Sequence, residues 1–269
     1  MLRKLGFVAL TLLATLGIDP VRADFVGTMI GGHVDIGVAF DGIGLEPHIH
    51  KHDEADLTLF GGTILTGDQE FAPADLWFGV RAGRTNIDGS EDATFRRPAG
   101  AEWDFLGVAE NDEIWVLPIV EQTNRPFVGV SAEELAGFSA VTVTINAITA
   151  RNGIGNSTFS VFKIDGNGQP DWASSTGVAI TDRQFTIPRA THDHFFMAFT
   201  DEGVFDVSLN FAATRTLDDV LFNSDATFTF AVGESNFAAV PEPTSMALLA
   251  CCGTVMIGVR KWRKKSKVA

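Results

Sequence analysis

Alternation of apolar and polar side chains along short segments constrains the fold of this chain more than any other feature of its sequence. Segments 141–145 and 227–230 repeat with a period of two, which places successive side chains on opposite faces of a β-strand. Similar runs occupy 34–40, 114–117, 158–164, 195–199 and 204–211, and turn-forming residues separate them at Asp41-Gly42, Arg151-Asn152-Gly153 and Asp165-Gly166-Asn167-Gly168. The pattern predicts strands joined by tight turns.

These strands follow one another without helical crossovers, which predicts an all-β fold, an antiparallel β-sandwich that is Ig-like or jelly-roll-like. The one helical signal is 131–135, where Ser131 is placed to cap a single turn with Glu134 at the third position. Segment 82–102 is rich in Gly, Asp, Thr and Arg, and we expect a long surface loop or a seam between two sets of strands.

Residues 1–23 have the three parts of a secretory signal peptide. Arg3 and Lys4 form a basic start, 5–18 is a nearly unbroken apolar run, and small residues occupy the two positions that signal peptidase reads, Val21 and Ala23. We expect export through the Sec machinery and cleavage after Ala23, which leaves 24–240 as the folded body.

Residues 241–269 form a second terminal segment. An extended polar lead-in precedes an apolar stretch at 245–259, and six basic residues follow within 260–269. The stretch is short compared with the roughly 20 residues of a bilayer span, but neighbouring residues can extend it. We expect a C-terminal transmembrane helix whose basic tail stays in the cytoplasm. The lead-in reads Val240-Pro241-Glu242-Pro243.

This tail resembles the PEP-CTERM sorting signal in its motif, its apolar span and its basic end, over roughly the last thirty residues. The resemblance implies processing by an exosortase-type protease in a Gram-negative bacterium that makes exopolysaccharide. It also implies transient anchoring in the inner membrane, followed by delivery to the cell surface or extracellular matrix. It carries no information about what the body does.

Charge and cysteine content exclude several classes of function for the body. The chain has a formal net charge of −14, yet residues 24–240 hold 32 of the 34 acidic and only 11 of the 20 basic side chains. Such an acidic body is unsuited to nucleic acid, which requires a basic surface. Both cysteines, Cys251 and Cys252, lie in the apolar tail, so the body has neither disulfides nor thiol chemistry.

Several phrases of the body resemble the choice-of-anchor M domain group of secreted bacterial proteins. The resemblance spans nearly the whole body and implies a surface-displayed β-domain without an assigned catalytic activity. Related surface-anchored proteins are associated with metal-uptake transporters. The resemblance therefore also suggests metal binding as a hypothesis for the body. The matching phrases are Gly32-His33-Val34-Asp35-Ile36-Gly37-Val38, the segment 100–108, Ile114-Trp115-Val116-Leu117-Pro118, and Phe127-Val128-Gly129-Val130 with Glu133-Glu134-Leu135 after it.

All six histidines fall in three clusters. At strand spacing, the members of each cluster share one face, and histidine with carboxylate is a ligand set for zinc, or for Cu(II) or Ni(II). The absence of cysteine favours an open His/carboxylate site over a closed structural one. The candidate ligands are His33 with Asp35; His48, His50 and His52; and His192 with His194, with Asp53, Glu54 and Asp193 close by in sequence.

The alternative is a set of unrelated surface histidines. Lys51 lies inside the second cluster, and Pro47 is unfavourable in a central strand because it cannot donate to the sheet. If the three clusters lie apart in space, they form no common site. The metal hypothesis therefore depends on whether the fold brings them together.

A calcium loop is a second candidate at 165–171, where oxygen-bearing side chains alternate around a glycine. The segment lacks the bidentate Glu at the twelfth position of an EF-hand loop, because Gly177 lies near that place. The alternative is a hairpin turn, since Asp-Gly and Asn-Gly form turns readily. The candidate ligands are Asp165, Asn167, Gln169 and Asp171.

Catalysis has little support in the sequence, which has no Gly-x-Ser-x-Gly motif. The favoured prediction is therefore a non-enzymatic exported protein of the surface or matrix. One alternative is an extracellular module that binds a transition metal for capture. The other is a protein that binds or acts on polysaccharide, with Glu102 and Asp104 beside a Trp103 platform, although we expect Trp103 and Trp115 to be core or seam residues.

Overall fold

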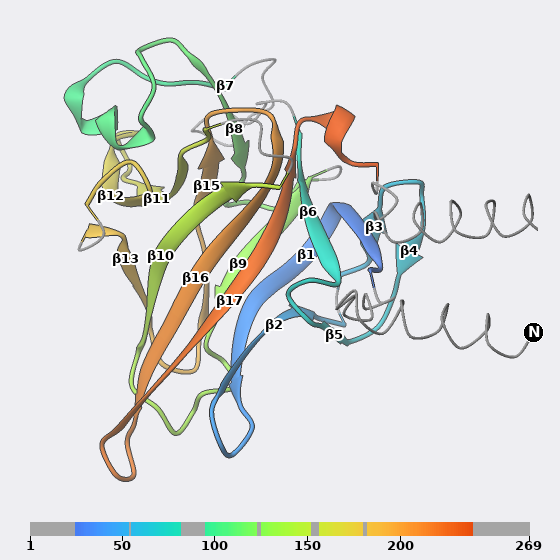
Figure 1. The fold of residues 1–269 in the computed structure, drawn as a ribbon, viewed down its shortest axis with the longest axis vertical. Helices are drawn as coiled ribbons and strands as arrows, with labels where there is room; N and C mark the ends of the chain where they lie inside the picture. Colours follow the sequence, from blue (N-terminus) through green and yellow to red (C-terminus); the bar gives the residue numbers. More distant parts are fainter. Residues whose placement is uncertain are drawn as a thin grey trace, which may run out of the picture. The chain divides into compact units, whose positions relative to one another are not determined.

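Two β-sheets pack face to face in the computed structural model, which describes residues 25–53, 55–81, 95–122, 125–151, 156–179 and 182–238 (Figure 1). Within these residues the larger sheet has twelve strands. Eight of them follow the order β13 (Gln184–Ile187), β10 (Val141–Ala150), β16 (Gly203–Arg215), β17 (Val220–Val232), β6 (Leu76–Val80), β1 (Gly27–Phe40), β2 (Leu45–Lys51) and β5 (Gln69–Phe71). The other four are β3 (Leu57–Leu59), β4 (Ile64–Leu65), β9 (Pro126–Ser131) and β14 (His192–His194).

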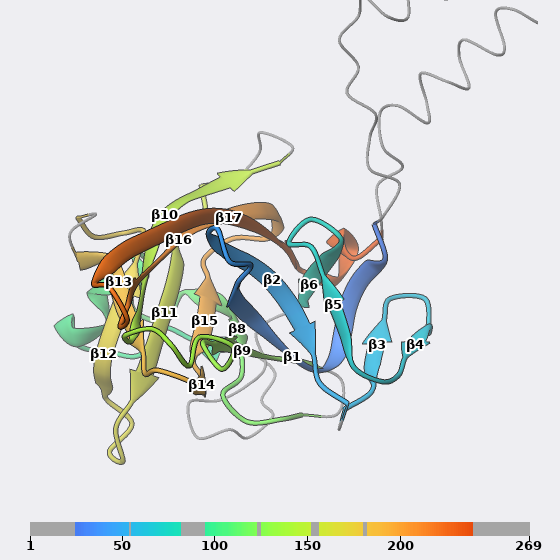
Figure 2. The same cartoon turned by 90° about the horizontal axis from the view of Figure 1, so that it is seen from below.

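The smaller sheet lies beneath the first, and Figure 2 shows β10, β16 and β17 arching over it. Its order is β12 (Pro170–Ser175), β11 (Phe159–Ile164), β15 (Phe196–Phe199), β8 (Glu113–Leu117) and β7 (Phe95–Arg96). Phenylalanines fill the space between the sheets. The ring centroid of Phe230 lies 5.1 Å from that of Phe199 and 5.7 Å from that of Phe159. Burial of each such side chain contributes about 1.5–3 kcal/mol.

A second apolar cluster covers the other face of the smaller sheet. The 3-10 helix η1 (Ala101–Leu106) places Trp103, which is fully buried, edge-on against Phe162 with ring centroids 5.9 Å apart. The prediction of a loop over 82–102 is therefore wrong for its last part, which forms β7 and the start of η1, and η1 is fixed by this packing. Residues 82–94 lie outside the described part of the chain.

The prediction of a sandwich of β-strands is confirmed, but the pairing is not antiparallel throughout. β1 pairs in parallel with β6 and with β9, and β6 pairs in parallel with β17. Parallel neighbours need long connections, and here each pair joins strands that are distant in sequence. Local alternation specifies a strand and its faces, but it does not specify which distant strand becomes its neighbour or in which direction.

Strand β1 changes partners halfway along its length. Its first part, up to Gly31, pairs with β3 and β6, whereas the part from Gly32 onward pairs with β2 and β9. Gly32 has φ 98°, and a Cβ there would lie 2.2 Å from the carbonyl oxygen of Asp56. Only glycine fits this conformation and this close approach. The change of partners brings the second half of β1 between β2 and β9, the strands that carry or flank most of the histidines.

The strand segments named from sequence alternation are confirmed within β1, β8, β10, β11, β15, β16 and β17. The predicted helical turn at 131–135 is wrong. Ser131 ends β9, and its Oγ accepts a hydrogen bond from the Glu133 N–H (3.2 Å) in a non-helical turn. In the described residues no helix is long and apolar enough to span a membrane. The predicted signal peptide, the motif 240–243 and the apolar stretch 245–259 lie outside those residues.

Candidate metal centre

Four adjacent strands bring the histidines together. In the order β2, β1, β9 and β14, the register places His50 opposite Asp35, Asp35 opposite Gly129, and Gly129 opposite His194. Side chains in register on neighbouring strands project from the same face of the sheet. The three sequence clusters therefore meet on one face, although they are separated by as many as 161 positions in the chain.

The six imidazole rings form a continuous group. Ring centroids lie 6.0 Å apart for His48–His50, 4.2 Å for His50–His52, 5.6 Å for His52–His33, 5.0 Å for His33–His194, 6.0 Å for His33–His192 and 5.4 Å for His192–His194. Pro47 does not prevent this arrangement, because β5 pairs with β2 only from Ile49 to Lys51 and leaves Pro47 with a single neighbouring strand, β1.

Three of these rings form a candidate ligand set, which we call the three-histidine site. One ring nitrogen from each of His33, His192 and His194 lies within 4.8 Å of the other two. In tetrahedral zinc coordination with bonds of 2.0–2.1 Å, neighbouring ligand atoms lie roughly 3.4 Å apart. A modest inward movement of these side chains would therefore bring three imidazoles to bonding distance of one ion.

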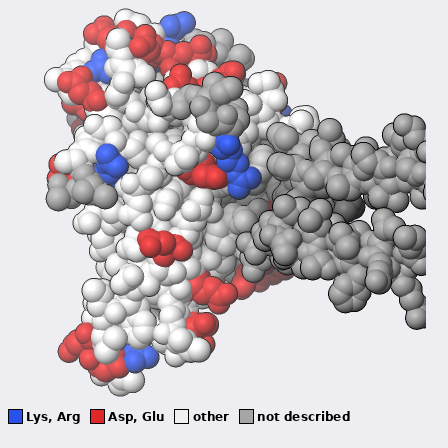
Figure 3. Space-filling view, in the orientation of Figure 1, with Lys and Arg blue, Asp and Glu red and all other residues white. Residues whose placement is uncertain are grey.

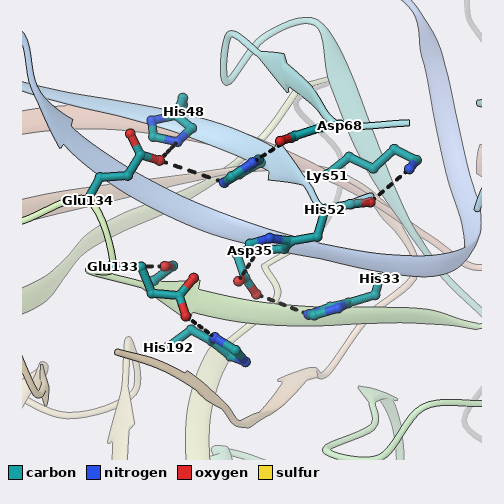
Figure 4. Close-up of polar contacts among 11 residues, drawn as sticks. His33, Asp35, His48, Lys51, His52, Asp68, Glu133, Glu134 and His192 are labelled. Atoms are coloured by element: carbon teal, nitrogen blue, oxygen red, sulfur yellow. Dashed lines mark hydrogen bonds and ion pairs between the residues drawn. The ribbon is translucent and has the colours of Figure 1, made fainter. Parts of the chain in front are cut away.

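Asp35 supplies the negative charge beside this site. Its side chain is fully buried, with Oδ1 3.3 Å from His33 Nε2 and Oδ2 3.0 Å from His52 Nε2, as Figure 4 shows. Burial alone would raise the pKa of Asp35, but the hydrogen bonds with His33 and His52 outweigh it and leave the pKa below its usual 3.8. A buried carboxylate that stays ionised favours a cation at this place.

The two histidines of β14 differ in their protonation. Burial penalises the charged ring of His194 and lowers its pKa to about 4; the Asp35 carboxylate opposes this effect, and the neighbouring His33 and His192 add to it. Burial also acts to lower the pKa of His192, but the hydrogen bond to Glu133 (Nδ1 to Oε1, 2.8 Å) and nearby carboxylates raise it overall. His194 is therefore neutral near pH 7, the state in which imidazole binds metal.

Neighbouring residues fix these rings in place. The ring of Phe127 stacks on His194 with centroids 3.7 Å apart and planes 8° from parallel. Lys51 is fully buried and donates from Nζ to the carbonyl oxygens of His52 (2.9 Å) and Gly67 (2.6 Å), which holds the end of β2. Gly129 leaves the necessary space, because a Cβ there would lie 2.0 Å from Asp35 Oδ1.

Apart from Asp35, which lies two residues from His33 as predicted, the acidic partners are not those nearest in sequence. Asp193 projects away from the two histidines that flank it and forms an ion pair with Lys163 (Nζ to Oδ2, 2.6 Å). The other carboxylates at the histidines belong to Glu133, Glu134 and Asp68. The only sign of these two glutamates in the sequence is that they are adjacent. The local pattern instead predicts Glu134 as part of a helix cap. Glu54 lies outside the described residues.

The segment proposed for calcium forms a hairpin turn between β11 and β12. Asp165 Oδ1 accepts hydrogen bonds from the backbone N–H groups of Asn167 (2.8 Å) and Gln169 (2.9 Å), and these two bonds lower the pKa of Asp165. Asp171 lies beyond the turn, in β12. The geometry is that of a hairpin turn, the alternative to a calcium loop, because the Asp165 carboxylate already accepts hydrogen bonds from the backbone of its own loop.

The polysaccharide platform suggested around Trp103 is wrong in its central residue. Trp103 is fully buried in the cluster beneath η1, and the carboxylate of Asp104 pairs with the guanidinium of Arg97. Trp115 is partly buried and packs against the main core. The expectation that these tryptophans are core residues is therefore confirmed for Trp103, and its ring offers no surface on which a sugar can stack.

Comparison of the chain with protein family models, with curated proteins and with solved structures found no match. We call the face of the larger sheet that carries His33, His48, His50, His52, His192 and His194 the histidine face; its geometry is what indicates a function.

Proposed function

We propose that this chain is an exported protein of the cell surface or extracellular matrix whose folded body binds a divalent transition-metal ion. The observation that carries the proposal is the three-histidine site, in which ring nitrogens of His33, His192 and His194 lie within 4.8 Å of one another. Zinc fits a set of imidazoles on a rigid sheet, with Cu(II) and Ni(II) as the first-row alternatives.

The surroundings of the site suit the binding of a metal ion. Asp35 offsets the charge of an ion, and its hydrogen bonds with His33 and His52 orient both rings, as the outer carboxylates of metal sites do. Both ligand strands, β1 and β14, are held by β9 between them. Such a face suits capture of a metal ion, and the non-enzymatic role rests on the sequence, which has no Gly-x-Ser-x-Gly motif.

The exported location rests on the two ends of the chain. The signal peptide predicted at 1–23 and the tail at 241–269 that resembles a PEP-CTERM signal support passage through the Sec machinery and release by an exosortase-type protease. The resemblance to choice-of-anchor M domains, with an Ig-like or jelly-roll-like sandwich, supports surface display near metal uptake. Acidic groups outnumber basic ones on the face in Figure 3, which suits a body that attracts cations.

The test is thermal unfolding with and without zinc. The full-length chain is purified in detergent without a polyhistidine tag, and Cys251→Ser and Cys252→Ser remove the thiols of the tail. At a zinc concentration of 100 times Kd, binding to the folded state alone stabilises it by about 2.7 kcal/mol. We expect the melting temperature to rise by several degrees over the value in chelator.

The variant His194→Gln removes one ligand of the three-histidine site and should lower this rise. Its matched control is Asp193→Asn, the neighbouring residue on the opposite face of β14, which should retain the full zinc effect even if its basal stability falls. Equal melting temperatures in zinc and in chelator for the unmutated body would contradict the proposal. So would an unchanged zinc effect in His194→Gln.

A further inference from the structure

A second set of ligands lies on the same face, apart from the three-histidine site. Glu134 lies beside His48 (Figure 4), with its Oε1 3.1 Å from His48 Nε2 and 3.7 Å from His50 Nδ1. The three ligand atoms lie within 4.8 Å of one another. His48 and His50 come from β2, whereas Glu134 comes from the turn after β9, 86 residues later than His48. None of the three belongs to the first site.

The outer nitrogen of each ring already has an acceptor. His48 Nδ1 lies 3.1 Å from the carbonyl oxygen of Glu46, and His50 Nε2 lies 2.8 Å from Asp68 Oδ1. A backbone carbonyl accepts and never donates, so the neutral His48 ring carries its proton on Nδ1 to satisfy this bond. The same reasoning places the proton of His50 on Nε2. This arrangement, an outer acceptor that fixes the tautomer, is typical of histidines that bind metal through the inner nitrogen.

The inner atoms then face one another as three electron-pair donors. His48 Nε2, His50 Nδ1 and the Glu134 carboxylate converge without a proton to share when both rings are neutral. Lone pairs at these distances repel unless a positive charge lies between them. Either an additional proton or a metal ion fulfils that need, and only a metal ion engages all three donors at once.

The packing around His48 keeps its ring in this position. Its side chain is only 8% exposed, and a Cβ on Gly37, the residue opposite on β1, would lie 2.8 Å from His48 Nε2. Glu134 is adjacent in sequence to Glu133, which contacts His192 at the first site. One turn thus presents one carboxylate to each group of histidines.

We propose that His48, His50 and Glu134 bind a second divalent transition-metal ion, so that the body holds two ions on one face. Two imidazoles and one carboxylate leave a coordination position for water, an arrangement that allows an ion to enter and leave more readily than at a fully occupied site. This inference extends the proposed function, but it stands on different residues and can fail independently of it.

The experiment measures metal stoichiometry. The full-length chain, untagged and carrying Cys251→Ser and Cys252→Ser, is loaded with zinc, dialysed and analysed for metal per chain, and cobalt is used as a spectroscopic probe of the same sites. We expect two equivalents in this background, and one in Glu134→Gln and in His48→Gln. The matched control is Glu46→Gln, which removes one exposed carboxylate from the same strand while its backbone carbonyl still accepts from His48; it should retain two.

The outcomes separate the two sites. A single equivalent that survives Glu134→Gln but is lost in His194→Gln would overturn the second site and leave the proposed function standing. A single equivalent that survives His194→Gln but is lost in Glu134→Gln would support the His48 site and overturn the three-histidine site. Two equivalents retained in both Glu134→Gln and His48→Gln, or no bound metal at all, would overturn this inference. Circular dichroism checks that each variant keeps its strands.

Discussion

The histidine face and the turn at 165–169 both have the spacing of a cation site in sequence, yet they differ in what their donor atoms already bind. In the turn, Asp165 accepts two backbone N–H groups of its own loop. On the histidine face, donors from distant strands converge. Glu134 lies close to one nitrogen of His48 and one of His50, and the other nitrogen of each ring already has an acceptor. For a cation site, ligand spacing in sequence therefore matters less than whether the local backbone has already bound the ligand atoms.

Among single substitutions at the two regions, Gly129→Ala on the histidine face should change stability and zinc binding the most. The new Cβ would lie 2.0 Å from Asp35 Oδ1 and 3.0 Å from His194 Cε1, so the carboxylate and the ring must both shift. We expect a loss of about 1–3 kcal/mol in the free energy of unfolding, typical of overpacking, together with loss of zinc binding. Chemical denaturation and metal analysis measure the two effects. The control is Gly166→Ala, in the turn, where a Cβ meets nothing within 4 Å; equal stability of both variants would contradict the account.

A smaller change is expected in how the free energy of unfolding of the metal-free protein depends on pH. The pKa of His194 is about 4 in the folded state, compared with about 6.5 in an unfolded chain. The unfolded state therefore binds this proton first, and the contribution of His194 to stability falls as pH drops from about 6.5 to about 4. His192 has a raised pKa and acts in the opposite sense, with stability present at low pH and lost as pH rises through its folded pKa.

Ring resonances measured by NMR in chelator distinguish the two histidines. His194 should stay neutral down to about pH 5, whereas His192 should titrate above its ordinary value. The loss of unfolding free energy between pH 7 and pH 5 should be smaller in His194→Gln than in the unmutated body. A common pKa near 6.5 for both rings would show that the site lacks the burial described here.

How much the sequence could predict differs between these regions. The strands and the turn at 165–168 follow from local chemistry, because alternation and Asp-Gly or Asn-Gly pairs act over a few residues. The histidine clusters were also identified from strand spacing. Glu134 was assigned to a helix cap, since its local context of Ser131 and Leu135 fits one equally well. Its true neighbours, His48 and His50, are set by the parallel pairing of β9 with β1, which no local pattern specifies.

The smallest change in melting temperature is expected from a substitution in the turn at 165–169. Asp165→Asn retains an oxygen that accepts the N–H groups of Asn167 and Gln169, so the melting temperature should change little. Calcium should shift the melting temperature equally in the variant and the unmutated body. A calcium-dependent rise that the variant loses would show that the turn binds calcium and that satisfied backbone bonds do not exclude a cation site.

Zinc K-edge X-ray absorption of the loaded full-length chain, untagged and with Cys251 and Cys252 replaced by Ser, identifies the atoms that bind the metal. Ligation by the histidine face predicts nitrogen scatterers at about 2.0–2.1 Å with the outer-shell signal of imidazole rings. His194→Gln with Glu134→Gln should lose the metal altogether. A first shell of oxygen alone, or zinc that is removed by dialysis from the unmutated body, would contradict the account.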